Sequence, residues 1–254
     1  MFNFRSINID MATETAWVGS GALLGELYYR ISEKSNVHGF PGGVCPTVGV
    51  GGHLSGAGYG NMLRKHGLTV DHVIDAKIVD ATGRVLDRKK SDYVKTPISK
   101  SDLESLFKKM VEVGKVGMVF NSYGGRMSEI PESETPFPHR AGNIFKIQYS
   151  VNWEDEGEEA DQNYIQQIRE MYSYMAPFVS KNPREAYLNY RDLDIGTTDN
   201  GKDSYDQGKV YGVKYFKDNF NRLVKIKTMV DPDNLFRNEQ SIPVLPFRGR
   251  KVRK

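Results

Sequence analysis

The segment from Pro41 to Gly60 is the part of the sequence best suited to hold a ligand, because glycines recur through it at short intervals. Closely spaced glycines let a backbone approach a bound group, and their amides can face phosphates or a planar ring. The usual dinucleotide spacing is missing, since the sixth position counted from Gly49 is Leu54 rather than glycine. No Gly-Lys-Ser/Thr follows, which excludes a nucleoside-triphosphate loop. Spacing alone leaves a ligand-binding segment and a purely structural glycine loop both open.

A second candidate lies on a predicted strand in the other half of the chain. Lys146 and Gln148 are two residues apart, so their side chains point to the same face of the strand, while Phe145, Ile147 and Tyr149 occupy the other face. Polar groups within an otherwise apolar strand are costly unless their face is wet or functional. The pair therefore marks either a solvent face or the floor of a site.

Cys45 and His53 stand within the glycine-rich segment and could do chemistry there, as a thiol and an imidazole. Each also has an ordinary interpretation, as a small buried thiol or a hydrogen-bonded core histidine. Because Cys45 is the single cysteine, an intramolecular disulfide framework and a cysteine-cluster metal site are excluded. We predict no metal site.

The elements expected to position these residues mix helices and strands without an internal repeat, so the predicted class is α+β. Apolar periodicity predicts three helices: one through Leu23 to Ile31 that ends near Ser35, one opened by a capping box at Ser101–Glu104, and one that ends near Met175. A last helix is predicted over Val210–Met229, after a polar loop at Thr197–Gly208.

Short extended segments alternate with these helices. Strands are predicted at Met1–Asp10, Ala16–Val18, Val37–Phe40, Val116–Phe120 and Asn143–Trp153, and a hairpin at Asp71–Leu86 with its turn at Ala81–Arg84. Tyr187–Asp192 is predicted as a strand or an extended loop.

Composition excludes several classes of protein. The 254 residues are 39% hydrophobic and 26% charged, a globular mixture, and no apolar run approaches the length of a membrane span. Net charge is +3, but Arg248–Lys254 carries five positive charges, and subtracting them leaves −2. No broad nucleic-acid surface is therefore expected. The basic tail itself has two interpretations, a solvated chain end or a segment with a nucleic-acid or nuclear role. The first residues lack the pattern of a signal peptide.

Four segments together carry a resemblance to a known family. They are Cys45–His53, Phe137–Gly142, Tyr187–Asp194 and Asp231–Pro243. In this order they resemble the berberine bridge enzyme-like family, plant oxidases of the vanillyl-alcohol-oxidase type that include the cannabinoid synthases. The resemblance implies a partial FAD-binding fold of the PCMH type with most of the substrate-domain sheet missing. It also implies FAD as the cofactor.

The resemblance assigns roles to particular residues. In the family, a cysteine at the position of Cys45 bonds covalently to the flavin ring. The implied cofactor contacts are Thr47, Gly49, Val50, Gly51, Gly52, His53, Ser55, Gly56, Tyr59, Val79, Asn189 and Arg191. Lys146 and Gln148 would lie over the flavin, and Tyr190 would be the base, as a tyrosinate whose pKa is lowered by a nearby cation. Tyr187 is the neighbouring candidate, and plain packing remains the alternative for Tyr190.

Two parts of the family pattern have no counterpart. No residue stands for the family's second flavin link, a histidine in a preceding subdomain, and the sequence after Lys89 continues at a motif that the family shows far downstream. The implied organisation is the end of the FAD-binding domain at 1–89, a remnant of the substrate sheet at 90–153, a returning helical segment at 154–247 and the basic tail at 248–254.

Two functions follow as alternatives. One is an FAD-dependent oxidase that transfers hydride from an activated carbon or alcohol to flavin, with reoxidation by O2. The other is a non-catalytic truncated remnant or binding protein of the same family. Expected partners are O2 and a small substrate (an aromatic alcohol, an alkaloid-like compound or a carbohydrate), and we expect a monomer. Family members are usually secreted, an expectation that transfers poorly to this chain.

Overall fold

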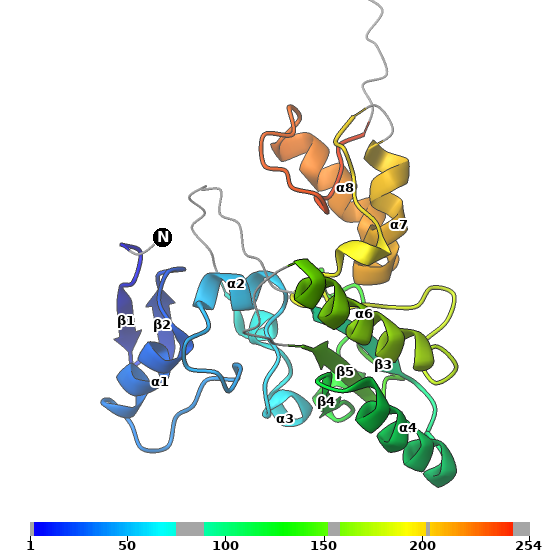
Figure 1. Ribbon diagram of the computed structural model, residues 1–254. Coiled ribbons are helices and arrows are strands. Elements are labelled where there is room, and N and C mark those ends of the chain that lie inside the picture. Colours follow the sequence, from blue (N-terminus) through cyan, green and yellow to red (C-terminus); the bar gives the residue numbers. More distant parts are fainter. Residues whose placement is uncertain (1–2, 75–88, 152–157, 202–203, 246–254) are drawn as a thin grey trace, which may run out of the picture.

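The structure is a computed structural model that describes residues 3–74, 89–151, 158–201 and 204–245. At its N-terminal side, β1 (Ile7–Asp10) and β2 (Thr15–Val18) form an antiparallel hairpin, with Ile7 opposite Val18. Helix α1 (Leu24–Ser32) packs beside this hairpin (Figure 1). Buried Ala22, Leu24, Leu27 and Val50 form the local core. The helix forms because its apolar residues recur every three to four positions.

Three short helices lie within and directly after the glycine-rich segment. They are α2 (Val50–Ser55), α3 (Leu63–His66) and the 3-10 helix η1 (Thr69–His72). Val50 anchors α2 in the core beside α1. The glycine run therefore lies between the N-terminal hairpin and the central sheet (Figure 1).

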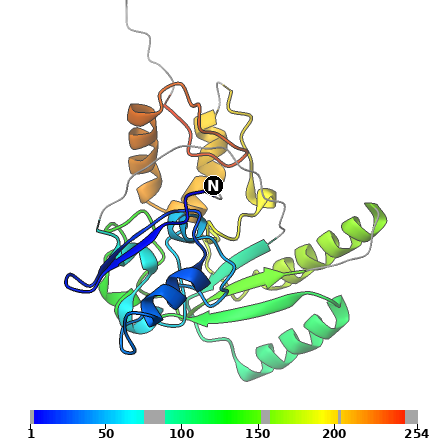
Figure 2. The same cartoon turned by 90° about the vertical axis from the view of Figure 1, so that its left-hand side faces the viewer.

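The central sheet has the strand order β3-β5-β4 and is entirely antiparallel about its middle strand. The strands are β3 (Lys89–Val94), β4 (Gly117–Ser122) and β5 (Phe145–Ser150), and the short helix α5 (Arg126–Glu129) follows β4. Helices α4 (Lys100–Val113) and α6 (Glu158–Tyr174) cover one face of the sheet (Figure 2). Val94, Leu106, Ile147 and Tyr149 lie in the core between them. The glycine-rich segment lies against the opposite face of the sheet, where its Tyr59 contacts Lys146 of β5.

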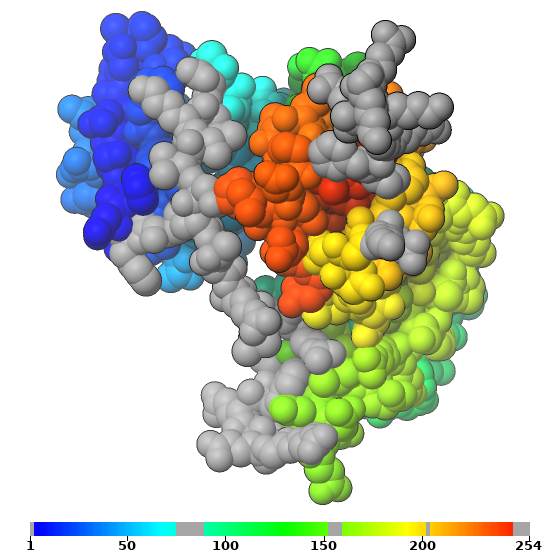
Figure 3. Space-filling view, turned by 90° about the horizontal axis from the view of Figure 1, so that it is seen from above, coloured from blue at the N-terminus to red at the C-terminus, as the bar shows by residue number. Residues whose placement is uncertain are grey.

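The last part of the chain is helical. After the 3-10 helix η2 (Leu193–Ile195), α7 (Ser204–Phe216) and α8 (Asn219–Val230) pack through Tyr211, Tyr215, Phe220 and Val224. In the space-filling view, the N-terminal segment lies at the left of the visible surface and these C-terminal helices lie at its right (Figure 3). The α+β class with only small sheets is confirmed. No helix of the described residues is long and apolar enough to cross a bilayer.

Several predicted elements differ from the structure. Val37–Phe40 is not a strand, and the predicted last helix is two helices separated at Lys217, whose φ of 48° is incompatible with a continuous helix. Helix α7 begins at Ser204, inside the predicted polar loop. The N-cap of α4 is Ser99 rather than Ser101, because the Ser99 hydroxyl accepts the amide of Asp102.

Two further predictions involve residues outside the description. Asp71 and His72, which open the predicted hairpin, lie in η1, and most of the remaining hairpin, 75–88, is outside the described residues. The basic tail at 248–254 is outside them too. Tyr187–Asp192 is a loop, which was one of the two predicted forms.

A buried ion cluster ties the central sheet to the C-terminal helices. His139 is fully buried; its Nδ1 lies 3.0 Å from the Glu185 carboxylate and its Nε2 lies 3.0 Å from the Tyr215 carbonyl. Burial lowers the pKa of His139 and favours the neutral ring, which carries a single N–H and therefore donates to only one of these two acceptors. Lys95 also donates to this carboxylate. Although burial opposes it, these donors lower the pKa of Glu185 from 4.5 to about 2.

This cluster predicts an acid-sensitive part of the stability. A carboxyl whose pKa is depressed by folding stabilises the protein above its unfolded pKa, and that contribution disappears as the pH falls through the folded pKa. For Glu185 it amounts to roughly 3 kcal/mol, lost between about pH 4.5 and pH 2. Urea unfolding of Glu185→Gln should therefore show a flatter pH dependence than the unchanged chain in this window. The exposed Glu129→Gln is the matched control, and equal slopes for all three proteins would refute the assignment.

Candidate functional site

The site is centred on Lys146, in the second position of β5. Its side chain is fully buried, and its Nζ has no hydrogen-bond partner among the described residues. Instead the amine faces three aromatic rings, 3.2 Å from the ring centre of Tyr59, 4.0 Å from Tyr187 and 4.5 Å from Tyr190. The sheet supplies Lys146, the glycine-rich segment supplies Tyr59, and the loop before η2 supplies the other two. An unpaired buried amine is costly, so this arrangement is the candidate for a functional centre.

The tyrosines are joined to one another around the amine. The hydroxyls of Tyr59 and Tyr190 are 2.7 Å apart and share a hydrogen bond. The rings of Tyr187 and Tyr190 meet edge to face at 5.1 Å. Asn189 donates to the Tyr187 hydroxyl and to the carbonyl of His53, both at 3.2 Å. The predicted residues Lys146, Tyr59, Tyr187, Tyr190 and Asn189 are thus brought together from three distant segments.

Further polar groups converge on the same face of the sheet. Tyr93 on β3 and Asn121 on β4 are the cross-strand partners of Lys146. The Tyr93 hydroxyl, the Asn121 Oδ1 and the Tyr123 hydroxyl are also buried and have no partner in good hydrogen-bond geometry among the described residues, although the two hydroxyls interact weakly with each other and Asn121 with Tyr59. A group of orphan polar atoms around one amine indicates a polar ligand or ordered water. Sequence analysis missed these residues, because the predicted strand ended at Phe120 and strand order is not visible in the sequence.

Gln148 lies beside Lys146 on the same face, as its spacing predicts. It is half-buried and pairs across the strands with Ser91 and Val119. Ile147 and Tyr149 face the helices, where both are fully buried. The Lys146 face is therefore directed toward the glycine-rich segment rather than toward open solvent.

Burial sets the protonation of the centre. It raises the pKa of Tyr59 and, more strongly, of Tyr187 and Tyr190, and it lowers the pKa of Lys146 well below its usual range. An interaction with Asn121 opposes part of the rise for Tyr59. The expected cation beside Tyr190 is present, but the expected lowering of the tyrosine pKa is not, because the same desolvation disfavours the charged form of the amine.

His53 connects α2 to this centre. Its Nε2 accepts the Gly43 amide at 3.2 Å, which places the proton of the neutral ring on Nδ1, and the Thr69 hydroxyl lies 3.2 Å from the same nitrogen. Burial, and then the charge of Lys146, lower the pKa of His53. The imidazole is therefore kept neutral.

The glycines of this segment fall into two groups. A Cβ at Gly51 would press on Ser20, and one at Gly58 on His53 and Thr69, so the packing of the protein accounts for those glycines. A Cβ at Gly49 or Gly52 would meet no described atom within 4 Å. No packing of the described residues accounts for these two glycines, which form an open cradle along α2. The cradle, the exposed Cys45 and the orphan polar atoms fit a planar group with polar edges, as FAD would supply.

The other predicted cofactor contacts are placed less centrally. Thr47 is exposed, Val50 is buried in the core beside α1, and Ser55 donates to the Gly52 carbonyl at 3.1 Å. Ser55 and Gly56 also line a small crevice with Phe137 and Leu188. Arg191 is exposed, and its charge acts on Tyr211 and Tyr215 of α7 rather than on the Lys146 centre. Val79 lies outside the described residues.

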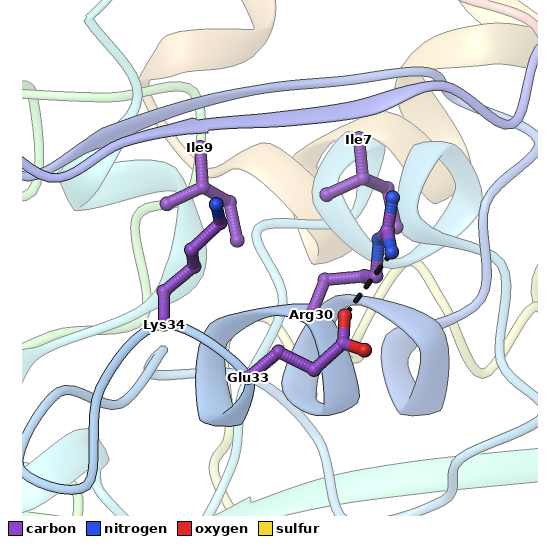
Figure 4. A pocket seen from close by; sticks show the side chains of 5 residues that line it. All are labelled: Ile7, Ile9, Arg30, Glu33 and Lys34. Carbon is purple, nitrogen blue, oxygen red and sulfur yellow. Dashed lines mark hydrogen bonds and ion pairs between the residues drawn. The ribbon is translucent and has the colours of Figure 1, made fainter.

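A separate concavity lies away from this centre. It has a volume of about 300 Å³ and lies between β1 and α1, lined by Ile7, Ile9, Arg30, Glu33 and Lys34 (Figure 4). Arg30 and Glu33, both at the end of α1, form an exposed ion pair of 3.1 Å on its helical wall. It holds none of the predicted site residues, so the Lys146 centre remains the candidate.

The cradle leads to a prediction that separates stability from ligand binding. Gly52→Ala introduces a methyl group into open space within a helix, so the melting temperature should stay equal or rise slightly, since alanine favours a helix by about 0.5–1 kcal/mol over glycine. FAD affinity should fall, because the methyl group occupies the cradle. Titration of added FAD into both proteins, followed by flavin fluorescence, measures this. Unchanged affinity would show that FAD does not lie against Gly52.

Comparison with known proteins identifies the family of the chain. The model of the FAD binding domain matches residues 1–88, and the model described as berberine and berberine like matches residues 186–243. Berberine bridge enzyme-like 19 of Arabidopsis thaliana is 40% identical over 400 residues, an alignment that covers 96% of this chain and 70% of the relative. A 254-residue chain cannot fill 400 aligned positions, so this relative carries a long internal stretch that has no counterpart here.

Solved structures give the same result. Phl p 4, a grass pollen allergen with glucose dehydrogenase activity, superposes with a TM-score of 0.88 at 30% identity, covering 96% of this chain and 80% of that one. Berberine bridge enzyme from Eschscholzia californica superposes with a TM-score of 0.90 at 25% identity, covering 97% and 80%. A variant of berberine bridge enzyme is described as a reticuline dehydrogenase. The chain belongs to the berberine bridge enzyme-like family of FAD-linked oxidoreductases.

Proposed function

We propose that this chain binds FAD and oxidises an alcohol, with Tyr190 as the proton acceptor and Lys146 as its charge partner. The main support for this proposal is the buried Lys146 amine, which has no hydrogen-bond partner among the described residues and faces three tyrosine rings. When bound, FAD supplies the hydride acceptor, and O2 afterwards takes up the two electrons. The substrate loses a hydride from carbon and a proton from its hydroxyl, which leaves a carbonyl product.

The proton is the part of this chemistry that the chain itself handles. Tyr190 shares a hydrogen bond with Tyr59, so the two hydroxyls act as one acceptor. Because burial raises the pKa of Tyr190, a tyrosinate is favoured only while Lys146 carries its proton. Proton uptake by Lys146 and proton loss by Tyr190 are therefore coupled, and the pocket stays neutral overall. Gln148 and Asn121 supply polar groups that orient the alcohol.

The glycine-rich segment would hold the cofactor. The backbone of Gly49 and Gly52 is open to a planar ring, and the Cys45 thiol is exposed beside this segment. We further propose that Cys45 bonds to the flavin ring. Replacing a ring C–H bond and the S–H bond by a carbon–sulfur bond releases two electrons and two protons, which O2 accepts as hydrogen peroxide. This gives a single covalent link.

Carbohydrates and aromatic alcohols are the proposed substrate classes. The first is supported by a structural relative described as having glucose dehydrogenase activity. The test is an anaerobic mixture of the FAD-loaded chain with members of each class, followed by admission of O2. Bleaching of the flavin by one class and recovery in O2 supports the proposal.

The second candidate is a flavin-binding chain without turnover. The long internal stretch that the relative carries and this chain lacks favours it. It predicts a stable yellow complex that no member of either class bleaches. That result would leave FAD binding in place and contradict the proposed oxidation.

A further inference from the structure

The two outer strands of the central sheet are protected very differently. The outer edge of β3 is covered, because Ser180 donates its amide to the Tyr93 carbonyl and Tyr187 donates its amide to the Ser91 hydroxyl, both at 2.8 Å. Five of the six β3 residues are buried. In the described part of the chain, by contrast, no backbone hydrogen bond joins β4 to any segment except β5. Val119 and Phe120 of β4 are 47% and 39% exposed.

The free edge of β4 presents a regular row of hydrogen-bonding groups. The Tyr123 amide donates to the Ile144 carbonyl, which fixes which residue pairs of this ladder are hydrogen-bonded. In an antiparallel ladder such pairs alternate along the strand, so Gly117, Val119 and Asn121 direct their backbone groups toward β5. The backbone amides and carbonyls of Met118, Phe120 and Ser122 consequently point away from the sheet.

The sequence of β4 lacks the usual protection of an open edge. Sheet proteins commonly guard an edge with lysine, proline, inward charges or a covering segment. The strand Gly-Met-Val-Phe-Asn-Ser at 117–122 has no charged residue and no proline. Two such strands can therefore approach each other without like-charge repulsion.

Helix α4 extends this surface with an apolar flank. Lys109 pairs with Glu170 of α6 at 2.6 Å, which identifies the side of α4 that faces α6. With 100° between successive helical residues, Phe107 and Val111 fall on the opposite side of the helix. They are 59% and 83% exposed. An apolar flank of α4 is thus directed away from α6.

The position of α6 places this flank beside the open edge. Lys90 of β3 lies 4.9 Å from the ring centre of Tyr172 on α6, so α6 covers the β3 side of the sheet. Helix α4 therefore covers the β4 side, as Figure 2 shows. Its Phe107 and Val111 flank the row of outward backbone groups on β4. The open edge of β4 and the apolar flank of α4 together form one surface, which offers both backbone hydrogen-bonding groups and apolar side chains.

The geometry points to a second copy of this chain as the occupant of this surface. Two β4 strands related by a two-fold axis are antiparallel, so each outward amide meets an outward carbonyl of the other copy. The result is a six-stranded sheet in which each α4 presents its Phe107 and Val111 to the α4 of its partner. A dimer is therefore proposed in place of the expected monomer.

Light scattering coupled to size-exclusion chromatography tests this dimer in the full chain. The expected mass is twice 28.7 kDa, falling toward one chain on dilution. Phe107→Glu with Val111→Glu places acidic groups against their counterparts and should give a monomer. Val210→Glu on α7, an exposed helical valine outside this surface, is the matched control and should stay dimeric. Phe107 and Val111 are both exposed and distant from the Lys146 centre, so the double variant should have the same circular dichroism spectrum as the unchanged chain.

Hydrogen exchange supplies a second readout on the strand itself. The amides of Met118, Phe120 and Ser122 should exchange more slowly at high protein concentration than at low concentration, while the exposed α8 terminus should not change. A wild-type chain that stays monomeric at all concentrations would overturn the proposal. So would a dimer whose mass is unaffected by the double substitution, because another surface would then hold it together.

Discussion

Tyr190→Phe is expected to slow flavin reduction by about 10²–10⁴-fold, the usual contribution of a positioned proton acceptor. The substitution removes the hydroxyl that shares a 2.7 Å hydrogen bond with Tyr59 and leaves the aromatic ring over Lys146 in place. FAD binding and melting temperature should change little, because the ring packing is retained. Anaerobic stopped-flow reduction of the FAD-loaded protein, with whichever substrate class bleaches it, measures the loss.

A matched substitution shows whether the slower flavin reduction is specific to the Tyr190 hydroxyl or follows from removing any tyrosine hydroxyl. Tyr205→Phe on α7 removes a hydroxyl bonded to Asn221 at 3.0 Å, in an exposed place far from the site, and should reduce flavin at the original rate. If Tyr190→Phe also retained the original rate, the proton would go elsewhere and the assigned role of Tyr190 would be wrong.

Arg140→Met is expected to lower the free energy of unfolding by about 3–5 kcal/mol, the cost of breaking a buried ion pair from one side. The Arg140 side chain is fully buried and donates to both carboxylate oxygens of Asp71, at 2.7 and 2.9 Å. It also donates to Thr135 and to the Phe137 carbonyl. Its loss leaves the nearly buried Asp71 carboxylate without its counter-charge, beside η1 and the glycine-rich segment.

An exposed arginine provides the control for this prediction. Arg126→Met breaks only a surface pair with Glu129, three residues along the same helix, and should change stability by less than about 0.5 kcal/mol. Adding Asp71→Asn to Arg140→Met should recover part of the lost stability, because the unpaired charge is gone. Urea denaturation of the four proteins provides the comparison, and equal stability of Arg140→Met and Arg126→Met would contradict the buried-pair account.

The sequence predicts best where the spacing of residues along one element decides the outcome. Alternation along β5 correctly places Lys146 and Gln148 on one face, opposite Ile147 and Tyr149. It cannot show that Tyr93 and Asn121 lie across from Lys146, because the order β3-β5-β4 follows from long-range pairing.

Other differences arise where tertiary contacts override local preference. The predicted last helix breaks at Lys217 without a glycine or proline, since the turn lets the Phe220 ring pack closely over Gly212. Arg191 adjoins Tyr190 in the sequence yet acts on α7. The loop is turned there because Lys90 holds the carboxylate of Asp192 at 2.8 Å, a buried pair separated by 102 residues.

Capture of flavin by Cys45 is the most direct test of the central claim that this chain binds FAD along its glycine-rich segment. The purified protein is incubated with FAD in air, precipitated with acid, and its visible absorbance is compared with that of Cys45→Ser. The account predicts a yellow pellet for the unchanged chain and a colourless pellet for Cys45→Ser, with flavin still bound by both before precipitation. A chain that stays colourless throughout, before and after acid, would contradict FAD binding and with it the proposed oxidation.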